Sequence, residues 1–301
     1  MILLQIADFR FGIQSDRESA LRQLMAANYT PFFRTETDGE ELLFLLDADA
    51  SLELPADEPL RTFDYALTDS PARLRIYGNR YLLTITHGPS GRTFSLEGVR
   101  EVDGRFRFAS DLTRRGIAPP RHILDHLLVF ALSLAVLEQG FLLIHSSTVV
   151  CAGKAVLFLG ESGTGKSTHS RLWLENLPDT SLLNDDGPAL RVQADGSVTV
   201  YGTPWSGKTP CYRDVSYPLG AFVRICRAPY NRLSPRLSAI QALGATLPSC
   251  LPTLQQEDTL LDRVCANLSA VLRVAPVFRM ECLPDADAAR VCREGLRPVL
   301  G

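Results

Sequence analysis

The chain has 301 residues, of which 46% are hydrophobic and 22% are charged, and its formal net charge is −3 at pH 7. These values are typical of globular proteins, and they exclude a disordered chain, a collagen-like repeat and a broadly basic nucleic-acid binder. At about 150 residues per domain, the length predicts two domains that can each bury a core of their own.

The first part of the chain, residues 1–118, has the pattern of a small, mainly antiparallel β domain. One amphipathic stretch, residues 17–27, places Leu21, Leu24 and Met25 on one side and predicts a helix. Short apolar or alternating runs between turn residues predict strands at 42–46, 60–67, 73–76, 81–86, 93–96 and 106–109. The glycine and prolines of residues 116–120 interrupt this pattern, so we place the domain boundary after residue 118. We find no catalytic motif in this part.

Residues 119–301 form the second predicted domain, which begins with an apolar helix at about 123–138. Gly140 follows this helix as a typical C-terminal cap. The strongly apolar part, residues 127–137, spans eleven residues, whereas a membrane-spanning helix needs about 20. We therefore expect a buried helix and no association with a membrane.

Strands and helices alternate through the rest of the second domain, which predicts a mixed α/β fold. Apolar runs predict strands at 141–145, 148–151, 155–159, 181–183, 189–192, 198–201, 219–225 and 276–283. Helical periodicity predicts one helix that carries Leu172 and Trp173, and further helices near 237–247, 259–272 and 285–296.

Seven cysteines lie between residues 151 and 292, and none of them forms a Cys-x-x-Cys pair that could hold zinc. This pattern indicates reduced, mostly buried thiols, which are typical of the cytoplasm. The N-terminus also lacks the basic region and long apolar core of a secretion signal. We expect a cytoplasmic protein.

The strongest motif is Gly-Glu-Ser-Gly-Thr-Gly-Lys-Ser at residues 160–167, which fits Gly-x4-Gly-Lys-[Ser/Thr] in full. It follows an apolar strand and precedes a helix, as a phosphate-binding loop requires. Glycines let backbone N–H groups turn toward phosphate oxygens, and the helix N-terminus favours an anion. In such a loop the lysine binds the terminal phosphates and the serine hydroxyl binds Mg²⁺. The expected nucleotide contacts are Gly160, Ser162, Gly163, Thr164, Gly165, Lys166, Ser167 and Thr168.

Two adjacent acids, Asp185 and Asp186, end the predicted strand that comes after this loop and its helix. An aspartate at a strand end beside a phosphate loop helps to hold Mg²⁺, and a second one can take a proton from an attacking hydroxyl. The alternative is a solvated Asp-Asp-Gly-Pro turn. The neighbouring phosphate loop favours the catalytic interpretation.

Three further residues are candidates because of where they lie. His145 ends a strand that leads toward the same sheet edge, although a histidine near apolar strands is often a core residue. Lys208 lies in the loop Tyr-Gly-Thr-Pro-Trp-Ser-Gly-Lys, where it could neutralise a transferring phosphate or be a surface cation. Arg227, like Arg224, ends a strand and is either a phosphate contact or an edge charge.

The order of these features resembles HPr kinase/phosphorylase and the nucleotide domain of phosphoenolpyruvate carboxykinases. Residues 144–167 carry the resemblance, together with Leu-Leu-Asn-Asp-Asp at 182–186 and Gly-Thr-Pro-Trp-Ser-Gly-Lys at 202–208. The resemblance implies an α/β (α+β) P-loop domain of this type behind the small N-terminal β domain. It also implies phosphorylation of a serine hydroxyl by ATP with Mg²⁺.

The same resemblance assigns roles to single residues. Lys166 and Ser167 would bind ATP–Mg²⁺, Asp185 would be the general base, Asp186 would support the metal and His145 would orient the acid pair. We expect Lys208 or Arg227 to steady the transferring group. The expected partner is a hydroxyl-bearing protein, peptide or small molecule and not a nucleic acid, and assembly into a homo-oligomer stays open.

Other functions compete with a kinase. A catalytically silent nucleotide-binding module is the main alternative, because we find no clear equivalent of the metal-supporting glutamate that follows the acid pair in the kinases. A carboxykinase would need a longer chain, and a motor NTPase would need switch and arginine-finger signatures that we do not find. The loop binds phosphates and not the base, so GTP, ADP or pyrophosphate stay open as ligands.

Overall fold

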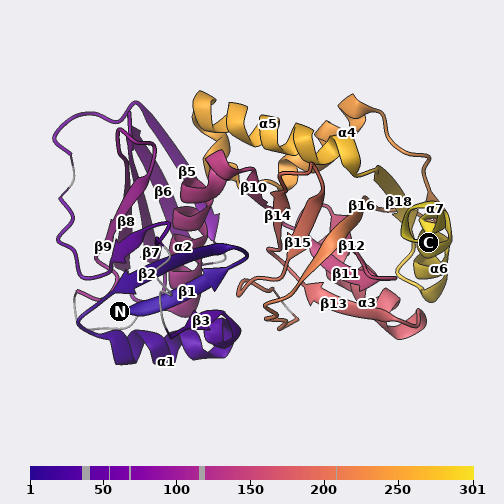
Figure 1. Ribbon diagram of the computed structural model, residues 1–301, viewed down its shortest axis with the longest axis horizontal. Helices are drawn as coiled ribbons and strands as arrows, with labels where there is room; N and C mark the ends of the chain where they lie inside the picture. Colours follow the sequence, from indigo (N-terminus) through magenta and orange to yellow (C-terminus); the bar gives the residue numbers. More distant parts are fainter. Residues whose placement is uncertain (36–40, 54, 68, 115–118, 208) are drawn as a thin grey trace. The chain divides into compact units, whose positions relative to one another are not determined.

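The computed structural model describes residues 1–35, 41–53, 55–67, 69–114, 119–207 and 209–301. The chain forms two compact units, Met1–Val136 and Leu137–Gly301. The described residues contain seven α-helices and two mixed β-sheets, one in each unit (Figure 1), which confirms the mixed α/β class.

The first unit is built on a nine-stranded sheet with the order β3-β1-β2-β4-β9-β8-β7-β6-β5. Its pairs are antiparallel except for β2 with β4 and β4 with β9. The predicted strands are present, and β1 and β2 form an additional hairpin at the N-terminus that we did not predict. The strands are β1 (Ile2–Ile6), β2 (Phe9–Gln14), β3 (Phe33–Arg34), β4 (Leu45–Asp47), β5 (Arg61–Leu67), β6 (Ser70–Tyr77), β7 (Arg80–His87), β8 (Arg92–Arg100) and β9 (Phe106–Ser110).

Two α-helices belong to this unit, α1 (Glu18–Tyr29) and α2 (Arg121–Val136). Helix α2 packs on β7, β8 and β9, and Gly98 of β8 leaves room for Phe108 and for Leu134 of the helix. The units therefore divide after α2, one helix later than the boundary expected after residue 118, and residues 115–118 lie outside the described residues. By length and composition Arg121–Gln139 could cross a membrane, and 61% of its apolar window is buried in the structure.

The second unit has a sheet with the order β10-β14-β15-β16-β12-β11-β13, and β18 pairs with β16 and β17. The pairs β12–β16 and β16–β18 are parallel, and the other pairs are antiparallel. The strands are β10 (Phe141–Leu143), β11 (Ser147–Cys151), β12 (Lys154–Leu159), β13 (Thr180–Asn184), β14 (Ala189–Val192), β15 (Val198–Tyr201), β16 (Ser216–Arg227), β17 (Arg232–Leu233) and β18 (Val277–Cys282).

The helices of the second unit are α3 (Lys166–Asn176), α4 (Ala239–Thr246), α5 (Asp258–Val274), α6 (Ala286–Gly295) and α7 (Arg297–Leu300). Single 3₁₀ turns lie at Thr30–Phe32, Leu137–Gln139, Leu247–Ser249 and Pro252–Gln255. Helices α3 and α6 pack together, and their apolar side chains join a core that includes Phe158, Trp173, Val223 and Met280. Burial of large side chains such as Phe158 stabilises the unit by about 2 kcal/mol each, and it fixes α3 against the strand that precedes it.

Candidate functional site

Residues 160–165 connect β12 to α3 and form the glycine-rich loop that the sequence predicts. Gly160, Gly163 and Gly165 have φ angles of +149°, +80° and +114°, which L side chains rarely adopt. A Cβ at Gly160 would also lie 2.5 Å from Thr164 Oγ1. Gly165 is the N-cap of α3, so the loop leads directly into a helix N-terminus, where free N–H groups favour an anion.

The Lys166 side chain folds back onto this loop. Its ammonium donates to the carbonyl oxygens of Gly160 at 2.8 Å and Glu161 at 3.3 Å, and the residue is 9% exposed. Burial lowers the pKa of this ammonium, while the carboxylates of Asp186 and Asp185 act in the opposite direction. Lys166 is therefore a mostly buried cation whose present acceptors are loop carbonyls.

Asp185 follows β13, and its carboxylate lies inside the protein at 5% exposure. Oδ1 accepts a hydrogen bond from the Ser147 hydroxyl at 2.6 Å, and Oδ2 accepts one from the backbone N–H of Thr209 at 3.1 Å. The Ser147 oxygen also lies 2.6 Å from the Ser170 hydroxyl of α3, which donates to it because the Ser147 proton is already given to Asp185. These contacts hold Asp185 in one orientation.

Asp186 is the exposed member of the pair. One oxygen of its carboxylate lies 3.3 Å from His145 Nε2, and the two side chains are 51% and 47% exposed. Asn184 fixes the turn, because its side-chain oxygen accepts from the backbone N–H groups of Asp186 at 2.9 Å and Gly187 at 2.8 Å. Partial burial and the Lys166 ammonium lower the pKa of His145, and Asp186 acts against them.

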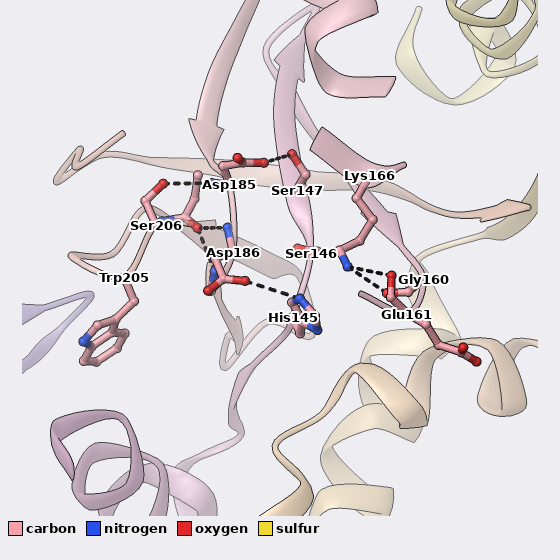
Figure 2. A network of polar contacts seen from close by, with 12 residues as sticks. His145, Ser146, Ser147, Gly160, Glu161, Lys166, Asp185, Asp186, Trp205 and Ser206 are labelled. Carbon is pink, nitrogen blue, oxygen red and sulfur yellow. Dashed lines mark hydrogen bonds and ion pairs between the residues drawn. The ribbon is translucent and has the colours of Figure 1, made fainter. Parts of the chain in front are cut away.

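Sheet register explains why these residues converge. β11 pairs with β13 through Thr148 and Asn184, and with β12 through Ser147 and Phe158. The start of β11 therefore lies beside the ends of β13 and β12. The chain continues from β13 into the acid pair and from β12 into the glycine-rich loop. The carboxylates of Asp185 and Asp186 act on the pKa of Lys166, and the charges of Lys166 and Asp186 act on the pKa of His145. Figure 2 shows the hydrogen bonds and the ion pair that these side chains make.

The remaining predicted residues are placed as follows. The Arg227 guanidinium donates to the carbonyl oxygen of Gly163, which brings this cation to the loop. Ser162 is exposed on the loop, and Ser167 and Thr168 are half-buried in the first turn of α3. Lys208 lies outside the described residues.

The expected Mg²⁺ ligands are the Ser167 hydroxyl and the Asp186 carboxylate, and oxygen atoms of these kinds suit Mg²⁺. No group of three or more His, Cys, Asp or Glu side chains in the described parts of the chain has an arrangement suited to a metal. Mg²⁺ bound mainly by phosphates and one or two carboxylates does not need such a group. The metal site therefore stays a prediction.

The sequence did not identify the residues that support Asp185. Ser147 and Thr209 are 38 and 24 positions away from it, and Ser206, whose hydroxyl accepts from the Asp185 backbone N–H at 3.3 Å, is also distant. Asn184 could have been identified from the motif Leu-Leu-Asn-Asp-Asp, because an Asn side chain before a turn often accepts hydrogen bonds from the backbone of that turn. The other partners depend on strand register, which local sequence does not show.

Comparisons with known proteins give a distant likeness. No family model and no curated protein matches the chain. Among solved structures, the HPr(Ser) kinase/phosphatase from Coxiella burnetii is similar to 53% of this chain and 99% of that chain, with 12% identity and a TM-score of 0.29. This is a distant structural resemblance to an HPr kinase.

Proposed function

We propose that this chain is an ATP-dependent kinase that transfers the γ-phosphoryl group to a hydroxyl acceptor, above all a serine in a protein, a peptide or a small molecule. One observation carries the proposal: the loop lysine, the oriented Asp185 carboxylate and the His145–Asp186 pair lie at neighbouring strand ends, close enough for their charges to act on the pKa of Lys166 and of His145. A phosphate loop alone serves any nucleotide-binding protein. Transfer to a hydroxyl also needs a group that takes the hydroxyl proton.

In this mechanism phosphate oxygens replace the loop carbonyls as acceptors for the Lys166 ammonium. The acceptor's hydroxyl oxygen attacks the γ-phosphorus, the bond from that phosphorus to the β–γ bridging oxygen breaks, and ADP leaves. The hydroxyl proton passes to Asp185. Ser167 and Asp186 would hold Mg²⁺, which would neutralise charge on the phosphates.

His145 and Arg227 have supporting roles in this proposal. A lowered pKa keeps His145 neutral at pH 7, so its ring can fix the orientation of the Asp186 carboxylate without adding a positive charge beside Lys166. Arg227, which already contacts the loop at Gly163, would stabilise the charge of the transferring group. Lys208 keeps the same expected role.

The experiment is ATP turnover with free serine, serine-containing peptides and HPr as acceptors. Asp185→Asn cannot take a proton, so we expect it to abolish acceptor-dependent ADP release while ATP affinity stays within a few-fold. Asp195→Asn is the matched control, because Asp195 is an exposed acid in the turn between β14 and β15. Turnover by Asp185→Asn equal to that of a clearly active wild type would contradict the assignment of the base.

A catalytically silent nucleotide-binding module is the second candidate, and the burial of Asp185 favours it. Both oxygens of this carboxylate are occupied by internal donors, so the residue could serve the fold alone. The kinase requires acceptor binding to expose Asp185, and catalytic contacts often form only in the substrate complex. Equal, negligible turnover of wild type and Asp185→Asn with every acceptor, at normal ATP affinity, would select the silent module.

A further inference from the structure

A pocket of about 690 Å³ lies on the sheet of the first unit, across β6, β7 and β8. The alternation of side chains along β8 shows which face carries it. Gly98 and its neighbour Phe108 face α2, because a Cβ at Gly98 would lie against Phe108 and against Leu134 of that helix. Ser95 lies three positions before Gly98 and lines the pocket, so the pocket is on the face opposite α2.

A row of cross-strand neighbours crosses this pocket. Thr84 of β7 pairs with Ser95 of β8 and with Arg73 of β6, and Arg73 pairs with Asp64 of β5. Side chains of directly paired residues lie on the same face of a sheet, so all four point to the pocket side. Each of them lines the pocket. The row is therefore a polar surface held in place by the strands themselves.

The segment after β4 forms a wall of the pocket, and hydrogen bonds fix it to the sheet. The backbone N–H of Ala50 donates to the carbonyl oxygen of Ser110 at 2.9 Å. The Arg80 guanidinium donates to the carbonyl oxygen of Glu53 at 3.1 Å. Leu52 and Glu53 both line the pocket. The pocket is thus formed before a ligand arrives, and its volume is within the range of about 300–1,000 Å³ that is typical of small-ligand sites.

Arg75 is the cation that this pocket offers to a ligand. The neighbouring Arg73 is already bound to Asp64 by two hydrogen bonds of 2.5 and 2.8 Å. Arg75 lies two positions further along β6 on the same face, and no described residue accepts a hydrogen bond from its guanidinium. The hydrogen bond from Arg73 is the main cause of the lowered pKa of Asp64, and the charge of Arg75 contributes to it. Arg75 is therefore close enough to the row to act on Asp64.

Hydroxyl groups beside Arg75 can donate to a ligand and accept from it. The Ser95 hydroxyl has no hydrogen-bond partner among the described residues. The hydroxyl oxygens of Thr86 and Thr93 lie 2.8 Å apart, so one proton of this pair stays available. Thr84 donates to the carbonyl oxygen of Arg73 at 3.3 Å and can still accept. A ligand with several hydroxyl groups of its own would satisfy these groups.

We propose that this pocket binds a small monocarboxylic acid rich in hydroxyl groups, such as a sugar acid. Its carboxylate binds the Arg75 guanidinium through two parallel hydrogen bonds, and its hydroxyl groups bind the serine and threonines of the pocket. A single negative charge is favoured, because three carboxylates, those of Glu53, Asp64 and Asp111, line the same pocket and repel a doubly charged phosphate ester more strongly. This site is separate from the glycine-rich loop and does not depend on the proposed function.

The test is calorimetry of the full chain without nucleotide, with gluconate as the probe. Glucose has the hydroxyl groups without the charge, acetate has the charge without the hydroxyl groups, and glycerol 3-phosphate has hydroxyl groups and two charges. The wild type should bind gluconate about tenfold more tightly than each of the other three compounds.

Two variants remove the groups that the proposal uses. Arg75→Gln removes the cation and should weaken gluconate binding about tenfold. Ser95→Ala removes a hydroxyl that no described residue uses, so it should weaken binding about threefold with an unchanged unfolding temperature. Arg92→Gln is the matched control, because Arg92 is an exposed arginine at the start of β8 that does not line the pocket. Its affinity for gluconate should equal that of the wild type.

The contrary results are distinct. No measurable binding of gluconate by the wild type, or equal binding by Arg75→Gln, would overturn the site. Glucose bound as tightly as gluconate would overturn the role of the cation, and acetate bound as tightly would overturn the role of the hydroxyl groups. Tighter binding of glycerol 3-phosphate would overturn the preference for a single charge. Failure of ATP to bind would contradict the proposed function and leave this inference standing.

Discussion

At the scale of single residues, Ser147 connects the proposed base to the helix that follows the glycine-rich loop. It donates to Asp185 and accepts from Ser170, and both serines are buried. Ser147→Ala leaves a buried carboxylate with one donor fewer and should lower the free energy of unfolding by about 1–3 kcal/mol. Ser170→Ala removes only an indirect contact and should cost about 0.5–1.5 kcal/mol.

Urea unfolding of the two variants measures this difference. ATP turnover with an acceptor should fall in the same order, because an Asp185 carboxylate held by Thr209 alone is less often in the right orientation for the hydroxyl. An unfolding free energy unchanged in Ser147→Ala would show that the serine does not support the carboxylate.

At the scale of elements, Asp125 links α2 to α1 within the first unit. Its carboxylate accepts from the Tyr29 hydroxyl at 2.7 Å and from the Asn28 side-chain amide at 3.2 Å. Burial raises the pKa of Asp125 from 3.8 to about 6, and the donors from α1 only partly offset that effect. The folded protein therefore binds this proton more tightly than the unfolded chain does.

The sign of the pH dependence follows from this raised pKa. The stability contributed by protonated Asp125 is complete below about pH 4 and is lost as the pH rises toward 6, at a cost of about 3 kcal/mol. Asp125→Asn has no such proton. We expect its advantage in unfolding free energy over the wild type to grow from pH 4 to pH 6 and then to stay constant. A difference independent of pH would contradict a raised pKa at Asp125.

At the scale of the whole molecule, patterns of the chain predicted most elements and the glycine-rich loop, because these depend on neighbours in sequence. The hairpin of β1 and β2 was missed. In β1, the side chains of Ile2, Leu4 and Ile6 are fully buried, and Leu3 is nearly so. The strand therefore lacks the alternation of apolar and polar residues that is typical of a strand with one solvent-exposed face. The first unit ends after α2, one helix later than the boundary expected after residue 118. Local sequence does not show that α2 packs on β7, β8 and β9.

In the candidate site, too, local sequence predicted some features and tertiary contacts determined others. The sequence predicted Lys166, the acid pair and His145 from motif and order, and the structure brings their charges together. The sequence could not predict that Asp185 is buried and Asp186 exposed, because the burial of Asp185 depends on strand pairing and on a hydrogen bond from Thr209. The roles of the two acids consequently need the variants proposed above.

The measurement that tests the central claim most directly is a calorimetric titration of ATP–Mg²⁺ into the wild type and Lys166→Ala. Loss of a charged hydrogen bond to phosphate should weaken binding about 10- to 100-fold. Lys154→Ala is the matched control, because Lys154 lies at the other end of β12 and donates to Val299 at 2.6 Å. The account predicts normal affinity for that control and weak binding for Lys166→Ala. Equal affinity in all three proteins would contradict it.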